Sequence, residues 1–457
     1  MATQRVVDIQ SVLTTYSSSK FPLEIGENGW LKTSDSRYFA PTLDRDHTCD
    51  WLVIGSGFAG ISAAKRLTEL RSGDKIILID AIGIGEGAAG QNSGFMIDVP
   101  HNINAKGDYL SSIKKDKDSI SLNREAIEFS SQMVEEFDIP QSVYNKIGKL
   151  NGAATPKGIS FNKDYKKQLE ALGEDYHSLD SKQMSEITGS NYYEQGIYTP
   201  GTILIQPAEY IKRIVERLSD KIKVFQNSPI KKIEKKNHSW DAYTSQGKII
   251  TKNIIFAVNG HITNFGFYKN QLIHIFTYSS LTKKFDDSIL KSDPSWGLTS
   301  SNPIGTTVRK IKVSKNQSRL LIRNTWRCRQ NLESLNSDFE NSCQKHRKSF
   351  IGRFPNLNEI PFEFSWGGRV CLSLNGAPAF GELDENLYSA CCSNGLGTVK
   401  GTLAGKLIID KACKSNSSQL DKYENIEKPS ILPPNFLTQI GANLRIKSRE
   451  MTAGRDL

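Results

Sequence analysis

The chain has 457 residues, of which 38% are hydrophobic and 24% are charged, and its formal net charge is +10. This length exceeds the usual size of a single core and predicts two closely packed domains, and the composition excludes a disordered or fibrous chain. No apolar run approaches the roughly 18 residues that cross a bilayer, and the first residues lack the apolar centre of an export signal. We therefore expect no transmembrane segment and no secretion.

Seven cysteines are present, an odd number, and none of them forms a Cys-x-x-Cys pair. This pattern predicts neither a disulfide framework nor a metal site, and it favours the reducing cytoplasm. The basic excess would suit a nucleic acid. However, the lysines are scattered and are not interleaved with aromatic residues, so we expect a lysine-rich surface and no nucleic-acid partner.

Residues 1–47 mix small polar residues with isolated aromatic residues and are predicted to form an extended arm over the body. A strand–turn–helix–strand unit follows. A short apolar run at 51–54 is typical of a buried parallel strand, residues 59–70 have helical apolar spacing, and residues 75–79 form a second apolar run. The right-handed crossover rule predicts that these two strands are parallel neighbours.

Farther along the chain, helical spacing or composition predicts helices over residues 120–137, 208–218 and 337–350. Short alternating segments predict a β-meander over residues 223–225, 229–233, 241–243 and 249–251. The apolar run 254–258 is predicted to return to the main sheet, and residues 266–350 to alternate short strands with the polar helix. Residues 389–409 are predicted to form a strand, a glycine turn and a helix.

The sharpest motif is Gly55-Ser56-Gly57-Phe58-Ala59-Gly60, which lies between the first strand and the helix. Gly55 would permit the tight turn, Gly57 would let the backbone approach a pyrophosphate, and Gly60 would let the helix pack on the strand. The phosphates would then lie at the helix N-terminus. Asp80, twenty residues after Gly60, would accept hydrogen bonds from ribose hydroxyls. The motif predicts a bound dinucleotide.

A second glycine-rich stretch, residues 83–95, directly follows this acid. A nicotinamide dehydrogenase needs no such loop here. An extended FAD does, because its ribityl chain and ring system lie beyond the pyrophosphate and need further backbone N–H groups. We therefore expect FAD.

With these motifs the sequence resembles the D-amino-acid oxidase superfamily, which includes glycine, sarcosine and putrescine-type amine oxidases. Residues 87–94 resemble the family's Gly-Ala-Ser-Gly-Arg-Asn-x-Gly loop, with Gln91 in place of the frequent Arg. Residues 224–230 resemble the segment whose aliphatic residue, here Ile230, covers adenine. Residues 257–260 resemble the strand end beneath the pyrophosphate.

Near the C-terminus, Trp366-Gly367-Gly368, residues 373–378 and Gly381 resemble the family signature Trp-x-Gly…Thr-Pro-Asp-Gly-x-Pro-x-Ile-Gly, with Asn375 where Asp is usual. Residues 391–398 resemble the closing Gly-x-Gly turn. The helix expected over residues 398–411 would direct its N-terminus at the flavin and stabilise negative charge on the reduced ring.

The motifs and the resemblance together imply a set of cofactor-binding residues. These are Gly55, Gly57, Phe58, Ala59, Gly60, Asp80, Ala81, Gly90, Gln91, Asn92, Ser93, Gly94, Ile230, Ala257, Asn259, Gly260, Gly376, Pro378, Gly395, Leu396, Gly397 and Thr398.

The substrate-domain candidates for the reaction are Tyr278, Arg323 and Trp326. Arg323 ends an apolar strand and could clamp a carboxylate with both of its terminal nitrogens, although a surface arginine is the alternative. His261 and His274 lie near the cofactor strand and fit a structural role better than that of a base. None of the cysteines stands at the family's covalent position, which Gly368 occupies, so we expect noncovalent FAD and no metal.

The resulting prediction is an α/β fold with two domains. A Rossmann-like FAD-binding domain is expected from residues 48–105, 205–265 and 355–412, and an α+β substrate domain with an antiparallel sheet from residues 106–204 and 266–354. Residues 413–457 are expected to form a C-terminal tail.

The predicted reaction is oxidation of a carbon–nitrogen bond in a small amine or amino acid to an imine, by hydride transfer to flavin N5. Oxygen or another electron acceptor would reoxidise the flavin. The alternatives are a flavin enzyme acting on a modified tRNA base, a flavin-dependent hydroxylase that uses NAD(P)H, and an interaction module that retains FAD as a structural prop.

Overall fold

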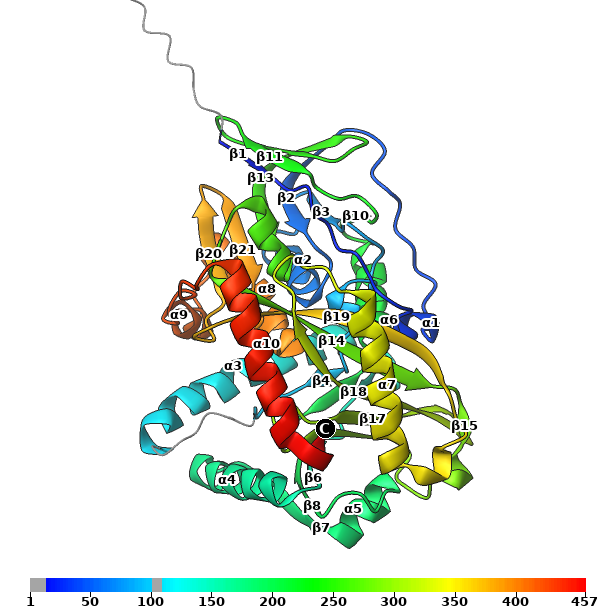
Figure 1. Ribbon diagram of the computed structural model, residues 1–457. Helices are drawn as coiled ribbons and strands as arrows, with labels where there is room; N and C mark the ends of the chain where they lie inside the picture. The colour runs from blue at the N-terminus through cyan, green and yellow to red at the C-terminus, as the bar shows by residue number, and fades with distance from the viewer. Residues whose placement is uncertain (1–13, 101–108) are drawn as a thin grey trace, which may run out of the picture.

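The computed structural model describes residues 14–100 and 109–457, without the side chains of residues 109–112. Two large sheets and one small sheet make up the molecule (Figure 1), and the large sheets lie one above the other in this view. The predicted end of the first FAD segment at residue 105, the start of the substrate domain at residue 106, and residues 1–13 of the arm lie outside the described residues.

The first sheet has parallel strands at its centre, in the order β1-β11-β12-β13-β2-β3-β10, with β21 beside β13 and β20 beside β21. Its strands are β1 (Thr15–Ser17), β2 (His47–Ile54), β3 (Ile76–Ile79), β10 (Lys223–Phe225), β11 (Lys232–Lys235), β12 (Trp240–Tyr243), β13 (Lys248–Phe256), β20 (Ala379–Asp384) and β21 (Leu387–Cys391). The parallel pairing of β2 with β3 confirms the predicted crossover.

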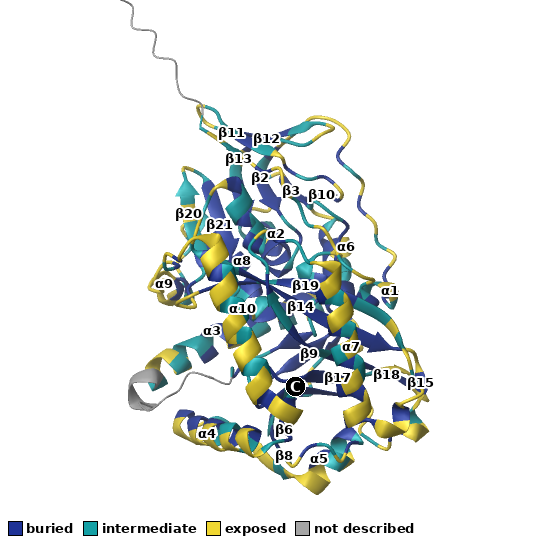
Figure 2. Ribbon diagram, in the orientation of Figure 1, coloured by how far each residue is buried: buried dark blue, intermediate teal, exposed yellow. Residues whose placement is uncertain are grey.

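The central strands are continuous apolar runs because both faces of this sheet are covered. Side chains such as Val53 and Leu78 on one face join a core shared with helices α2, α3, α6 and α8, while Leu52 and Ile77 join a core on the other face. Complete burial of one such side chain stabilises the fold by about 1.5–3 kcal/mol. In Figure 2 these strands are coloured as buried, and the outer helices carry exposed residues.

The second sheet runs in the order β19-β14-β18-β17-β16-β6-β8-β7, with β15 beside β18. Its strands are β6 (Lys149–Ala153), β7 (His177–Asp180), β8 (Gln195–Thr199), β14 (Leu272–Thr282), β15 (Phe285–Asp286), β16 (Trp296–Ser300), β17 (Thr307–Ser314), β18 (Gln317–Cys328) and β19 (Phe362–Ser373). The sheet is antiparallel except that β16 and β6 are parallel. A small sheet of β4 (Phe95–Met96), β9 (Ile203–Ile205) and β5 (Tyr144–Asn145) lies between.

Ten α-helices are present in the described part of the chain. They are α1 (Gly29–Lys32), α2 (Phe58–Leu70), α3 (Tyr109–Glu136), α4 (Pro156–Leu172), α5 (Ser181–Thr188), α6 (Pro207–Leu218), α7 (Asn336–Arg353), α8 (Thr402–Ala412), α9 (Ser418–Glu424) and α10 (Asn435–Ala453). None of the helices formed by residues 14–100 and 109–457 combines the length and the apolar character of a membrane span.

The fold class matches the prediction, and several elements differ from it. β10 pairs in parallel with β3 and is not part of the meander, which consists of β11, β12 and β13. The two expected strands at 249–251 and 254–258 are one strand, β13, because β12 pairs with its first half and β21 with its second half. The strands expected to be short within 266–350 include β14 and β18, which are 11 and 12 residues long.

The division into domains stays a prediction, and the chain crosses between the two sheets more often than that prediction assumes. β19, expected in the FAD-binding domain, pairs with β14 in the second sheet. Helix α3, expected in the substrate domain, packs in the core beneath the first sheet through Ala126, Phe129 and Met133.

Both ends of the described chain are fastened to the body. β1 of the N-terminal arm pairs with β11, and the Asn28 amide donates to the Gly90 carbonyl at 3.0 Å. The segment expected as a tail contains α9 and α10. Helix α10 lies across β18 (Figure 1), and the last residues end in a turn whose Asp456 is 2% exposed.

Candidate functional site

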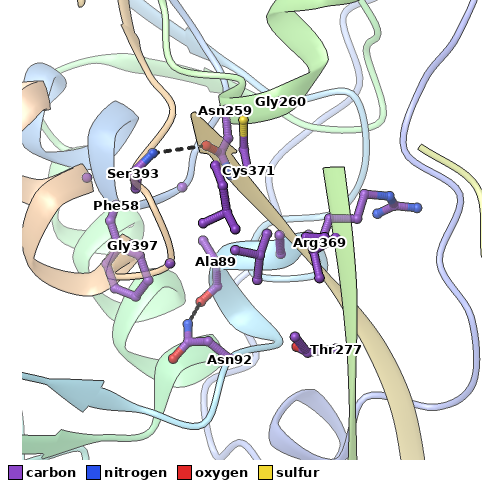
Figure 3. A pocket seen from close by; sticks show the side chains of 18 of the residues that line it. Phe58, Ala89, Asn92, Asn259, Gly260, Thr277, Arg369, Cys371, Ser393 and Gly397 are labelled. Carbon is purple, nitrogen blue, oxygen red and sulfur yellow. Dashed lines mark hydrogen bonds between the residues drawn. The ribbon is translucent and has the colours of Figure 1, made fainter. Parts of the chain in front are cut away.

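A single cavity of about 820 Å³ connects the carboxyl ends of the first sheet's parallel strands with the face of the second sheet. One end is lined by the glycine turn after β2, and the other by side chains of β14 and β18. Figure 3 shows that Phe58, Asn259, Cys371 and Thr277 surround this space, although they come from four distant parts of the chain. The cavity is therefore continuous from the dinucleotide motif to the candidate substrate residues.

The turn after β2 has the geometry that its glycines predict. Gly55 has a φ of +103°, which side chains rarely adopt. A Cβ atom on Gly60 would lie 1.7 Å from the Gly55 carbonyl oxygen, so helix α2 can pack on the turn only with glycine there. The Asp80 carboxylate accepts hydrogen bonds from the Ser56 amide at 2.7 Å and the Ser56 hydroxyl at 2.6 Å. The acid thereby fixes the turn while lining the cavity.

The second glycine-rich loop is folded by its own polar groups. The Asn92 amide donates to the Ala89 carbonyl at 2.6 Å (Figure 3), and its oxygen accepts from the Gly94 amide at 2.7 Å. The buried guanidinium of Arg309, an arginine of β17, donates to the carbonyls of Ser93 and Gly94 at 3.3 Å. Sequence reasoning missed Arg309, because its strand lies more than 200 residues away.

The two remaining cofactor segments meet at the ends of β13 and β21. Asn259 has a φ of +47°, and its side-chain oxygen accepts a hydrogen bond from the Ser393 amide at 3.4 Å (Figure 3). After Ser393 the chain makes one turn of π-helix over Gly397–Gly401 and continues as α8. The helix predicted from Thr398 thus begins as a wider turn, and its N-terminal end faces the cavity.

Most of the predicted cofactor residues line the cavity: Gly55, Gly57, Phe58, Ala59, Asp80, Ala81, Gly90, Asn92, Ser93, Ile230, Ala257, Asn259, Gly260, Gly395, Leu396, Gly397 and Thr398.

Five predicted residues lie outside the lining. Gly60 is beneath the turn, and the Gly94 amide is held by Asn92. The Gln91 side chain turns away to donate to Glu24, while the Gln91 carbonyl accepts from the Trp366 indole at 2.8 Å. Gly376 and Pro378 belong to the turn between β19 and β20, which the Asn394 amide braces by donating to the Gly376 carbonyl at 3.0 Å.

At the other end of the cavity, strand alternation decides which candidates face inward. Thr277 of β14 lines the cavity, so its neighbour Tyr278 points to the opposite face, where its hydroxyl lies 2.7 Å from the Ser334 hydroxyl. The expectation that Tyr278 contacts substrate is therefore not met. Arg323 and Trp326 both line the cavity although they are three residues apart. The register shifts between Tyr278 and Ser279, and this β-bulge returns both side chains to one face.

Arg323 is a partly buried cation without an acidic partner among the described residues. Its guanidinium lies 4.8 Å from the centre of the Trp326 ring and donates to the Thr307 hydroxyl at 3.2 Å, while Nε has no partner. Burial lowers the pKa of Arg323 to about 10, so the side chain stays charged at neutral pH. A cation held in this way offers free donors to an anion in the cavity.

The two candidate histidines line the cavity and are neutral. Burial, with Arg369 and His274 nearby, lowers the pKa of His261 to about 3. Burial lowers the pKa of His274 to about 4, and its ring packs on the Gly260 backbone. Because neither imidazole takes up a second proton at neutral pH, neither adds positive charge to the site.

Cys371 also lines the cavity, on β19. A hydrogen bond with Cys392 and burial raise the pKa of the Cys371 thiol well above its usual value. All seven cysteines are free. In the part of the chain that the structure describes, no cluster of His, Cys, Asp and Glu side chains could hold a metal ion.

Among the lining residues that were not predicted, two groups contain arginines. Arg369 faces the cavity with its stem, and its guanidinium points away (Figure 3) to pair with Glu24 at 2.7 Å. Ala442, Arg445, Ile446 and Arg449 of α10 also line the cavity. Their spacing places them along one side of the helix, but the sequence does not say what that side faces.

The comparisons with known proteins agree with this geometry. A sequence model of the DAO family, described as FAD dependent oxidoreductase, matches residues 50–411. The chain is 22% identical to the probable oxidoreductase OrdL of Haemophilus influenzae, over 90% of this chain and 93% of that protein. It is 23% identical to the gamma-glutamylputrescine oxidoreductase of Escherichia coli, over 91% and 94% of the two chains.

Solved structures with the same fold include the glycine oxidase of Geobacillus kaustophilus, with a TM-score of 0.67 and 15% identity over 81% of this chain and 96% of that one. The L-proline dehydrogenase of P. horikoshii has a TM-score of 0.64 and 14% identity, over 84% and 98%. At these identities the likeness concerns the fold alone.

Proposed function

Because the chain belongs to the DAO family of FAD-dependent oxidoreductases, we propose that it oxidises the carbon–nitrogen bond of a small amine or amino acid to an imine, which water then hydrolyses. The observation that carries this proposal is the partly buried guanidinium of Arg323, which has no acidic partner among the described residues and lies in the same cavity as the dinucleotide motif. This cation can bind the carboxylate of an amino acid and so orient the bond to be oxidised.

The residues present fit an FAD. Its adenosine would lie near Asp80 and Ile230, and its pyrophosphate would accept from backbone amides after Gly55 at the start of α2. The ring system would reach the ends of β13 and α8, where Gly397 leaves open space on the cavity side. When bound there, FAD supplies the acceptor for the substrate hydride. We also propose that binding is noncovalent, since a thiol with a raised pKa such as that of Cys371 is a poor nucleophile.

The protein's own residues position the substrate and supply little acid–base chemistry. Arg323 would hold a carboxylate, Trp326 would provide an apolar wall, and Thr277 would face the reacting end. His261 and His274 stay neutral, so the amine would have to bind in its neutral form. The activity should therefore rise with pH as the free amine loses its proton.

The names of similar proteins support this substrate class. An oxidoreductase of gamma-glutamylputrescine, a glycine oxidase and an L-proline dehydrogenase all act on molecules with a carbon–nitrogen bond next to a C–H bond. We place the enzyme in the reducing cytoplasm on the basis of its free cysteines. Oxygen, or another electron acceptor, would complete the cycle.

An anaerobic screen tests the proposal. Purified holoprotein is mixed with a panel of amines and amino acids, and with NADPH, in the absence of oxygen, and the flavin absorbance is followed. We expect at least one amine to bleach the flavin and NADPH to leave it oxidised. Bleaching by NADPH, with no response to any amine, would replace the proposal with a hydroxylase. If neither bleaches the flavin, the proposal is also overturned.

A further inference from the structure

The C-terminal helix α10 is fastened along its length to the second sheet. The Asn443 side chain exchanges two hydrogen bonds with the backbone of Cys328, at 2.9 and 3.1 Å. The Gln439 side-chain oxygen accepts from the Gln330 amide at 3.0 Å. About two turns beyond Asn443, Glu450 pairs with Arg327 at 3.0 Å. The helix therefore has a fixed rotation relative to the cavity.

The turn after α10 locks its far end. The Asp456 carboxylate accepts from the Ala154 amide at 2.8 Å and from the Thr155 hydroxyl at 2.5 Å. The Asp456 carbonyl accepts from the Thr306 amide at 2.8 Å. Because Asp456 is buried, this anchor is part of the packed structure. Helix α10 is thus held firmly in place as one wall of the cavity at its substrate end.

Fixing this rotation directs the side of α10 that carries Ala442, Arg445, Ile446 and Arg449 toward the cavity. The opposite side carries exposed apolar residues such as Ile440 and Leu444, and Figure 2 shows exposed residues along the outer side of the helix. Neither guanidinium group has an ion pair or a hydrogen bond with any described residue; Arg445 is exposed and Arg449 is partly buried.

The charge at this end of the cavity is unbalanced. Of the described residues that line the cavity, the sole acidic one is Asp80, at the dinucleotide end. Lys20 pairs with Glu333, and Arg369 pairs with Glu24. Arg323, Arg445 and Arg449 are thus left without acidic partners. Arg445 and Arg449 are four residues apart on α10, so they lie on the same side of the helix, and both line the cavity. Burial and the nearby charge of Arg445 lower the pKa of Arg449.

We propose that the substrate carries a second acidic group in addition to the carboxylate assigned to Arg323, and that Arg445 and Arg449 of α10 bind it. The substrate class is then an amine with two anionic groups, either two carboxylates or a carboxylate and a phosphate-like group. This inference rests on the proposed function, because that function determines where the bond to be oxidised lies in the cavity. The anion site itself follows from the unpaired guanidinium groups.

The test uses ligands that bind without being oxidised. Holoprotein is titrated with malonate, succinate and glutarate, with the monocarboxylates acetate, propionate and butyrate, and with 3-phosphonopropionate, and the shift of the flavin spectrum gives each Kd. We expect at least one two-anion ligand to bind at least about tenfold more tightly than the monocarboxylate that lacks its second acidic group, as acetate does relative to malonate. This advantage should shrink as the salt concentration rises. Tight binding of the phosphonate alone would assign the second group as phosphate-like.

The double variant Arg445→Gln/Arg449→Gln should remove the advantage of the two-anion ligands and leave the Kd of monocarboxylates within about twofold. Lys447→Gln is the matched control, since it removes a positive charge from the exposed side of the same helix. Equal binding of one- and two-anion ligands would overturn the inference, and so would an equal loss in the control.

The two proposals fail in different ways. If amines bleach the flavin but the α10 arginines do not discriminate between ligands, the substrate class is wrong and the reaction stands. If no amine bleaches the flavin while two-anion ligands bind through the arginines, the reaction is wrong and the anion site stands.

Discussion

Replacement of Arg323 with alanine should weaken the binding of carboxylated substrates and spare the rest of the enzyme. The Arg323 side chain is partly buried, and its guanidinium lies over Trp326 and donates one hydrogen bond to the Thr307 hydroxyl. Its remaining donors point to a cavity with no acidic residue at that end. The variant removes these donors without leaving a buried carboxylate unpaired, because none is paired with Arg323 in the described structure.

The size of the effect follows from the kind of bond that is lost. A hydrogen bond to a charged group contributes about 1.5–3 kcal/mol. At about 1.4 kcal/mol per factor of ten, KM for a carboxylated amine should rise roughly 10- to 150-fold. Arg323→Lys keeps the positive charge but loses the planar guanidinium group, so its KM should lie between that of the wild type and that of Arg323→Ala.

The assay compares KM and kcat for an amino acid with those for the amine that lacks its carboxylate, in wild-type and variant proteins with equal FAD content. We expect the change in KM for the amino acid alone. An unchanged KM for both substrates would refute the assignment of Arg323 to substrate binding. An equal loss for both would show that Arg323 supports the structure and does not recognise the carboxylate.

Three further results are expected. Gly57→Val should yield protein without FAD, because side-chain atoms would occupy the space of the pyrophosphate; a variant with wild-type FAD content in its absorbance spectrum would contradict this. Denaturation should release FAD from both wild type and Cys371→Ser, and flavin that stays with the precipitated chain would show a covalent bond. Acidification from pH 7 to 5 should lower the unfolding free energy by about 2 kcal/mol for each histidine that the fold keeps neutral. Such histidines are His261, His274 and the buried His346 of α7, whose pKa values lie near 3 or 4 in the folded state and near 6.5 in the unfolded state. The stability that these histidines contribute above pH 6.5 is thus lost as the unfolded chain takes up protons. Urea unfolding at pH 7 and pH 5 should show a smaller loss of unfolding free energy for His346→Gln than for wild type. An unfolding free energy that does not change between the two pH values would contradict the assignment.

The sequence was most informative where the chemistry is local. The glycine turn at 55–60 needs only a strand, a tight turn and a helix in succession, and the structure has β2, the turn and α2 at those positions. Asp80 follows at the end of the next strand, where parallel pairing brings it against the turn. Short-range spacing therefore sufficed to predict the dinucleotide end of the cavity.

Features that depend on pairing between distant segments could not be predicted. A bulge in β18 brings Arg323 and Trp326 to one face of the sheet, and alternation along β14 turns Tyr278 to the other face. The local sequence pattern does not predict how these two strands are paired. Residues 435–453 belong to the segment 413–457, which was expected to form a C-terminal tail. Only the hydrogen bonds of Asn443 and the burial of Asp456 make that helix a wall of the site.

Titration of the purified protein with FAD, followed by flavin absorbance and fluorescence, tests the central claim most directly. That claim is that the amides after β2 and those at the start of α8 hold the two ends of a single FAD in one cavity. We predict a yellow protein that saturates with FAD in an equimolar ratio. A chain that stays colourless after it is supplied with the cofactor would contradict the account.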